Sequence, residues 1–201
     1  MAPVSLQTKK KGKKAAFIEY VKSIVEQAGF LLSGDVVVEL EWFVHEQKRY
    51  ESADSADVDN IIKPLLDGLC GARGIMVDDS QVQSVRCAWV DSYDYDQEQV
   101  KVIVKYSPDE FLSKNNLVFI NMGEGLCMPL NRHIPEHLQA SFLSIFSSML
   151  ENRAYLVSMG ASYYEAKKAL SVQRIFHKCR LEDFSVMELV EIELELGLEN
   201  G

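Results

Sequence analysis

The chain has 201 residues, of which 47% are hydrophobic and 25% are charged, close to the usage of globular proteins. No run approaches the ~20 apolar residues of a membrane span, and no apolar signal-peptide core follows the first residues, so we expect a cytoplasmic protein without membrane association. The four cysteines and four histidines are scattered and include no Cys-x-x-Cys pair, which argues against a disulfide framework or a zinc site.

The formal net charge of −9 argues at first sight against a nucleic-acid-binding protein, because Lys and Arg supply most of the affinity for phosphate. The charge is unevenly distributed, however, and much of the acidic excess lies between Asp57 and Asp79 and near the C-terminus. A short N-terminal stretch is strongly basic, and it could follow a phosphate backbone or form a solvated tail. Its lysines are Lys9, Lys10, Lys11, Lys13 and Lys14.

Hydrophobic spacing predicts alternating helices and strands over residues 1–110. Apolar residues at helical spacing predict a helix over 15–28, and residues 35–44 read as a central strand buried on both faces. A helix over 60–69 ends before Gly71, a short apolar strand over 75–77 ends at Asp78 and Asp79, and residues 82–90 and 99–106 are expected to form a hairpin. This pattern predicts an α/β (α+β) domain with a mixed β-sheet and helices packed on it.

Residues 111–201 have a different character and are expected to form a mainly helical C-terminal extension. Helices are predicted over 135–151 and 161–178. Around residues 192–196 apolar and acidic residues alternate as in a strand, but the composition favours a helix, so the sequence leaves both readings open.

The segment from Asp57 to Asp79 carries the residues with chemical potential. Asp57 and Asp59 point to the same side of an extended chain, and their oxygens could converge on a hard cation such as Mg²⁺. Asp59, Lys63 and Asp67 are four residues apart and share one face of the predicted helix. Carboxylates gathered in this way repel one another unless a cation compensates them, and a metal beside an ammonium suits phosphodiester hydrolysis.

The same residues also fit separate structural roles. An Asp before a helix is commonly an N-cap, an Asp pair after a strand is commonly a turn, and Lys63 with Asp67 could form a surface ion pair. Spacing alone does not decide between these roles and a metal site.

The ordered pattern is Asp57-x-Asp59-Asn60, Lys63, Asp67-Gly-Leu and then Asp78-Asp79-x-Gln-Val, and it resembles the signature of the RusA-like family of Holliday junction resolvases. The resemblance covers roughly residues 3–106. It implies a homodimeric, metal-dependent nuclease in which Asp57, Asp59 and Asp79 are the essential acidic residues and Lys63 is the catalytic lysine. Asp78 is a further candidate metal ligand, and Asn60 and Asp67 are supporting residues.

We therefore expect a Mg²⁺-dependent endodeoxyribonuclease, with Mn²⁺ as a substitute and no nucleotide cofactor, that cleaves branched DNA in recombination and repair. One alternative is a non-catalytic DNA-binding or protein-interaction module on the same fold. Haloacid-dehalogenase-like phosphatases also use an Asp-x-Asp pair, a lysine and a later Asp pair, but here all elements fall between residues 57 and 79, which is compact for that class.

Overall fold

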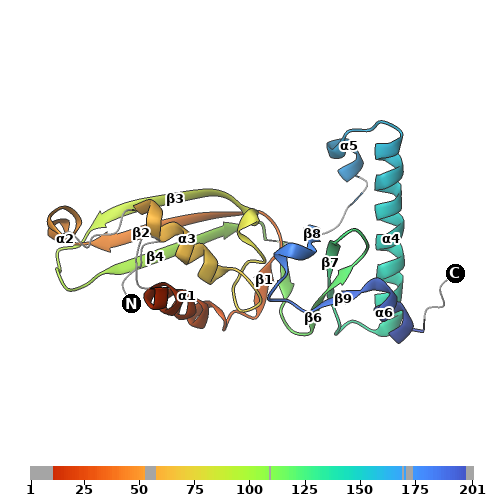
Figure 1. The fold of residues 1–201 in the computed structure, drawn as a ribbon, viewed down its shortest axis with the longest axis horizontal. Coiled ribbons are helices and arrows are strands. Elements are labelled where there is room, and N and C mark those ends of the chain that lie inside the picture. Colours follow the sequence, from red (N-terminus) through yellow and green to blue (C-terminus); the bar gives the residue numbers. More distant parts are fainter. Residues whose placement is uncertain (1–10, 53–57, 109, 169, 171–173, 198–201) are drawn as a thin grey trace. The chain divides into compact units, whose positions relative to one another are not determined.

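The computed structural model describes residues 11–52, 58–108, 110–168, 170 and 174–197 (Figure 1). The chain divides into two compact units, Met1–Leu112 and Ser113–Gly201. Helices and mixed sheets together give the α+β fold class predicted from the sequence. Within the described ranges, no helix has the length and apolar character needed to cross a membrane.

A three-stranded sheet with the order β3-β2-β4 forms the centre of the first unit. It consists of β2 (Val36–Val44), β3 (Val82–Asp91) and β4 (Gln99–Tyr106). The predicted central strand is confirmed, since β2 pairs with β3 in parallel and with β4 in antiparallel orientation. The predicted hairpin is wrong: β3 and β4 are neighbours in sequence but pair with opposite edges of β2, so that Val38 lies between Val85 and Val104.

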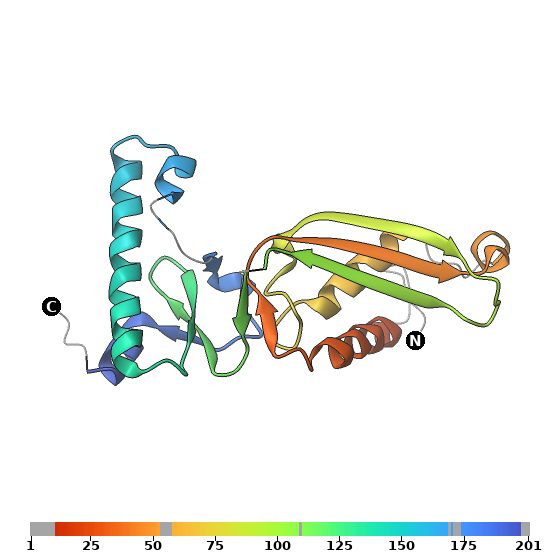
Figure 2. The ribbon, with the colours of Figure 1, turned by 180° about the vertical axis from the view of Figure 1, so that it is seen from behind.

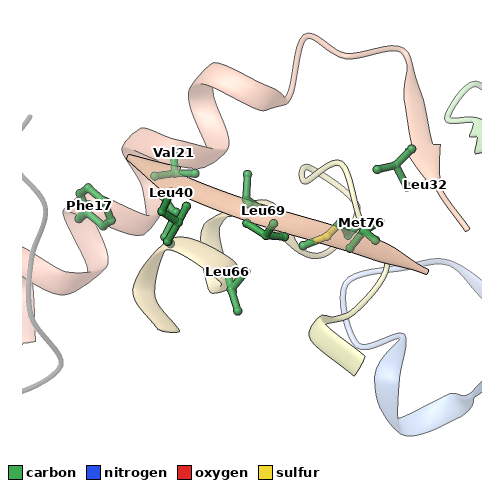
Figure 3. Packing of buried hydrophobic residues seen from close by; sticks show 10 residues of the cluster. Phe17, Val21, Leu32, Leu40, Leu66, Leu69 and Met76 are labelled. Atoms are coloured by element: carbon green, nitrogen blue, oxygen red, sulfur yellow. The ribbon is translucent and has the colours of Figure 1, made fainter. Parts of the chain in front are cut away.

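Two helices cover one face of this sheet, as Figures 1 and 2 show from opposite sides. They are α1 (Lys11–Val25) and α3 (Val58–Leu69), and α3 lies in the crossover that the parallel β2–β3 pair requires. Along β2 the residues of one face are buried and those of the other are half-buried, because only the first face meets the helices. Figure 3 shows the resulting core, which includes Phe17 and Val21 of α1, Leu40 of β2, Leu66 and Leu69 of α3, and Met76.

The helix α1 begins inside the lysine stretch, at Lys11, and ends at Val25, so it starts and ends earlier than the predicted range of 15–28. Its close packing on α3 depends on Gly68, where an added Cβ would lie 2.6 Å from the Cβ of Val21. The polar stretch after β2 contains a further short helix, α2 (Glu46–Glu51). A small two-stranded sheet pairs β1 (Phe30–Leu32) with β5 (Phe111–Ser113).

The end of α3 leads into a tight segment before β3. Gly71 has a φ of 90°, which favours glycine, and its N–H donates to the carbonyl of Met76 at 3.0 Å. The predicted strand over 75–77 is wrong, because Met76 makes only isolated bridges to Leu32 and Cys70. The short 3₁₀ helix η1 (Asp79–Gln81) follows, with Asp78 as its N-cap.

The second unit contains the predicted long helix and, in addition, a sheet that the sequence did not reveal. The sheet has the order β8-β7-β6-β9, and α4 (Glu136–Ser158) runs seven residues beyond the predicted end. A helix over 161–178 is wrong, since α5 (Tyr163–Lys167) is short and Phe176 already belongs to a strand. The strands are β6 (Leu117–Asn121), β7 (Leu126–Asn131), β8 (Phe176–His177) and β9 (Val186–Glu188).

The C-terminal segment, for which both strand and helix remained open, forms the helix α6 (Leu189–Glu195). Ile192 of α6 is buried with Leu143 of α4, Ile120 of β6 and Leu130 of β7. These residues form the core of the second unit. Both views place α6 beside one end of α4 and α5 beside its other end.

Candidate active site

Lys63 lies between two carboxylates on the surface of the first unit. Its Nζ is 2.6 Å from Oδ2 of Asp79 and 2.9 Å from Oδ1 of Asp67. Lys63 and Asp67 share one face of α3, as their spacing of four residues requires, whereas Asp79 comes from η1. The crossover between β2 and β3 therefore brings together charged side chains that are 16 residues apart.

These contacts keep Lys63 positively charged. Hydrogen bonds from Nζ, first to Asp79 and then to Asp67, raise the pKa of Lys63 well above its ordinary value of 10.5. The lysine side chain remains 49% exposed, so solvent can reach the ammonium group. Pairs this exposed contribute only ~0–1 kcal/mol to the free energy of unfolding, which makes a purely stabilising role a poor explanation for the arrangement.

Gln81 fixes the position of the Asp78–Asp79 turn. It is fully buried, and its Oε1 accepts hydrogen bonds from the backbone N–H groups of Val77 at 2.7 Å and Asp78 at 3.1 Å. Its Nε2 donates to the carbonyl oxygens of Leu32 at 3.0 Å and Gly34 at 2.7 Å. One side chain thus joins the turn to the segment that enters β2, and it holds Asp79 opposite α3.

Asp78 has a structural role in this turn. Its Oδ1 accepts a hydrogen bond from the N–H of Ser80 at 3.0 Å, and together with Gln81 it forms a capping box for η1. In the sequence Gln81 stands out only as part of the Asp78-Asp79-x-Gln-Val motif, and its role in holding the turn was not predicted. The spacing Asp78-x-x-Gln81 was the available signal, because it is the spacing of a capping box.

The start of α1 brings part of the lysine stretch to the same place. The Nζ of Lys14 is 3.7 Å from Oδ2 of Asp67, while Lys13 is exposed to solvent. Lys11 belongs to the first turn of α1, and Lys9 and Lys10 lie outside the described residues. Two cations, Lys14 and Lys63, therefore flank Asp67.

Of the remaining predicted site residues, Asp57 lies outside the described residues, and for Asp59 the structure describes the backbone, at the start of α3, but not the side chain. Asn60 follows in α3 and is buried. Among the side chains that are described, no group of three or more His, Cys, Asp or Glu residues is arranged to hold a metal ion. The described acidic oxygens near Lys63 come from Asp67 and Asp79.

A half-buried thiol, that of Cys70, lies close to this site. Burial, reinforced by the negative charges of Asp79 and Asp78, raises the pKa of Cys70 to about 12. Cys70 is therefore a neutral thiol at physiological pH and not a nucleophile. The position of Cys70 was not predictable from the sequence, since isolated cysteines carry no spacing information.

Comparison with protein families matches residues 4–105 to the family described as Endodeoxyribonuclease RusA. No curated protein and no solved structure shows significant similarity to the chain. The matched residues make up about half of the chain and contain α1, the strands β2 and β3, all of β4 except its last residue, and the whole segment from Asp57 to Asp79. The resemblance expected from the sequence is thus confirmed, and the chain belongs to the RusA endodeoxyribonuclease family.

Proposed function

We propose that the protein is a Mg²⁺-dependent endodeoxyribonuclease that cleaves branched DNA, including Holliday junctions, during recombination and repair. Family membership supports DNA as the substrate. The observation that carries the proposal is the protonated Lys63 held between Asp79 and Asp67 on an accessible surface. An ammonium in this position suits the stabilisation of negative charge that develops on a phosphodiester during hydrolysis.

Lys63 acts in this proposal as a fixed positive charge and not as a base. Its raised pKa leaves no free amine to accept a proton near neutral pH. The Nζ donates to a phosphate oxygen, and it exchanges one of its carboxylate partners for this contact. Asp67 keeps Lys63 in place from the next turn of α3.

Asp57, Asp59 and Asp79 would hold the metal ion, with Asp78 as a further candidate ligand. The donor chemistry fits a hard cation, because Mg²⁺ prefers carboxylate oxygens and usually takes only one or two of them together with phosphate and water. When bound, the ion would polarise the phosphodiester and make a bound water more acidic. Asp79 is partly exposed, and Gln81 holds its turn in place.

A branched DNA substrate has consequences for the number of chains that act together and for the residues that contact DNA. Two symmetric cuts in a four-way junction require two sites, so we propose a homodimer with one site in each chain. The lysines at the start of α1 would contact the DNA backbone, with Lys13 exposed and Lys14 close to Asp67. The contribution of these lysines should fall as the salt concentration rises.

Cleavage of a labelled synthetic four-way junction tests this function. Wild type should produce paired, symmetric nicks with Mg²⁺ or Mn²⁺ and none with EDTA, and a linear duplex of the same sequence should remain intact. Asp79→Asn and Lys63→Met should abolish the nicks. Asp91→Asn is the matched control, because Asp91 is exposed at the far end of β3, about 30 Å from Asp79 along the strand.

The outcomes separate the competing functions. Junction binding without cleavage by either metal would contradict the enzyme and leave a DNA-binding module. Cleavage that survives both Asp79→Asn and Lys63→Met would place the chemistry elsewhere in the chain.

A further inference from the structure

A series of planar side chains runs from the core of the first unit to its surface, at the end of β2 and β3. Trp42 of β2 is buried, and its ring stacks on that of Trp89 of β3, with the centroids 4.3 Å apart. The guanidinium carbon of Arg49 in α2 lies 4.9 Å from the ring centroid of Trp89 and 4.8 Å from that of Tyr50. We call Trp42, Trp89, Arg49 and Tyr50 the planar stack; its outermost ring, Tyr50, is 67% exposed.

Contacts on two sides hold the short helix α2, which carries the outer end of the planar stack. The helix begins directly after β2 with His45 as its N-cap, whose side chain accepts a hydrogen bond from the N–H of Gln47 at 3.1 Å. Lys48 lies over the ring of Tyr95 at 4.8 Å from its centroid, and the ring of His45 meets the same tyrosine at 5.4 Å between centroids. A ring that is fixed in advance loses little freedom when it binds a ligand.

The planar stack lies at the end of the first unit where α3 begins. Figures 1 and 2 show α2 at the end of the sheet where β2 and β3 terminate. Trp89 and Val58, the first residue of α3, both pack against the buried cluster that contains Ile61. Lys63 follows Val58 by five residues, which is about 8 Å along the helix axis. A phosphodiester at Lys63 and a base at Tyr50 can therefore belong to one DNA strand, a few nucleotides apart.

The charges around the planar stack favour an uncharged planar group over a run of phosphates. The loop after β3 contains Asp94 and Asp96, and α2 carries Glu46 and Glu51 beside its two cations. Duplex DNA would bring the phosphates of both strands to this acidic edge. An unpaired base is uncharged and offers a π-face, which aromatic rings and arginine side chains bind in single-stranded nucleic acids. Branched DNA supplies such bases where its strands separate.

We propose that the planar stack binds an unpaired base of branched DNA on the outer face of Tyr50, while Arg49 lies over the ring from within. The base fixes the position of the strand that passes Lys63. Because an aromatic ring stacks on any base, the contact selects a place at the branch and not a sequence. This inference rests on the proposed function, since it takes branched DNA as the substrate, and it makes Tyr50 a binding residue.

Fluorescence anisotropy with a labelled forked duplex that has two unpaired arms tests this contact. The titrations contain EDTA, so that cleavage plays no part. Tyr50→Ala should bind the fork about tenfold more weakly than wild type, as expected for the loss of one stacked base. Tyr50→Phe keeps the ring and should bind as wild type does. Tyr93→Ala is the matched control, because Tyr93 is fully exposed and lies outside the planar stack.

The outcomes separate this inference from the proposed function. Wild type that binds neither the fork nor a four-way junction would contradict the proposed function itself. Tight binding of the fork by wild type and Tyr50→Ala alike would overturn the role of Tyr50 and leave the function standing. An equal loss in Tyr93→Ala would also overturn it.

Photocross-linking identifies the ring that the base meets. A fork with 5-iodouracil in one unpaired arm is irradiated with the protein, and mass spectrometry locates the cross-linked peptide. The cross-link should fall on Tyr50, persist in Tyr93→Ala and disappear in Tyr50→Ala. A cross-link that falls only on other residues would contradict the proposal.

Discussion

Replacing Gln81 by Met should destabilise the first unit, because methionine fills a similar volume but cannot make hydrogen bonds. The buried N–H of Val77 and the partly buried N–H of Asp78 lose their acceptor, and the carbonyls of Leu32 and Gly34 lose a donor. Each buried group left unpaired costs ~1–3 kcal/mol. A carbonyl oxygen has a second lone pair and loses less than an N–H group does. Counting mainly the two N–H groups, we expect a loss of about 2–5 kcal/mol in the free energy of unfolding.

Urea unfolding followed by tryptophan fluorescence measures this loss in the relevant unit. The chain has two tryptophans, Trp42 in β2 and Trp89 in β3, and both belong to the first unit. Their stacked rings, with centroids 4.3 Å apart, report directly on the pairing of these strands. A signal from the second unit therefore does not obscure the transition.

Gln83→Met provides the matched control, since it makes the same chemical change two residues away. Gln83 is exposed and its amide donates to Oδ2 of Asp35 at 2.6 Å, so its replacement should change the stability by no more than ~0.5 kcal/mol. If Gln81→Met cost no more than Gln83→Met, the reasoning about the buried amide would be refuted. With a typical stability of ~5–15 kcal/mol the Gln81 variant stays largely folded, and its cleavage activity should still fall because Asp79 loses its support.

Three further predictions follow from the charges of the site. Asp79 and Asp67 raise the pKa of Lys63 above 10.5, so its ammonium group stays protonated as the pH rises toward that value. Wild type and Lys63→Arg should therefore show parallel cleavage–pH profiles between neutral pH and about pH 10. Loss of cleavage at alkaline pH in wild type alone would contradict this. Iodoacetamide at mildly alkaline pH should modify the exposed Cys179 in the folded chain but leave Cys70 unmodified. Mass spectrometry of peptides measures the labelling of each cysteine. Equal labelling of the two would contradict the raised pKa of Cys70. Lys13→Gln/Lys14→Gln should reduce the slope of log affinity for DNA against log salt concentration by up to ~0.9 per lysine, whereas Lys167→Gln/Lys168→Gln in the second unit should leave it unchanged.

The elements predicted most accurately from the sequence are those with a regular spacing of apolar residues. The alternation along β2 and the helical spacing of α3 both reflect one buried face, and the stop at Gly71 reflects a single backbone angle. The hairpin prediction failed because adjacent strands with a short connection usually pair with each other, and nothing in residues 92–98 indicates that β2 lies between them. The sheet of the second unit was missed because its outer strands are only two or three residues long.

The candidate site was predictable in part for the same reason. The spacing of Lys63 and Asp67 on one helix identifies their contact without knowledge of the fold. The approach of Asp79 to Lys63 depends on the crossover geometry, and the role of Gln81 depends on partners at positions 32, 34, 77 and 78. Side chains whose partners are scattered along the chain leave no periodic signal, so their function appears only in three dimensions.

The position of β2 between two distant strands also has a consequence for how the first unit folds. Val36 pairs with Val82 on one side and with Tyr106 on the other, so neither partner is available until long stretches of chain have been ordered or synthesised. Contacts of this kind make folding slow, because the entropy of closing a long loop is lost before the strands can pair. A nascent chain that stops short of β4 would expose one edge of β2, and we expect the first unit to become stable only after residue 106 has left the ribosome.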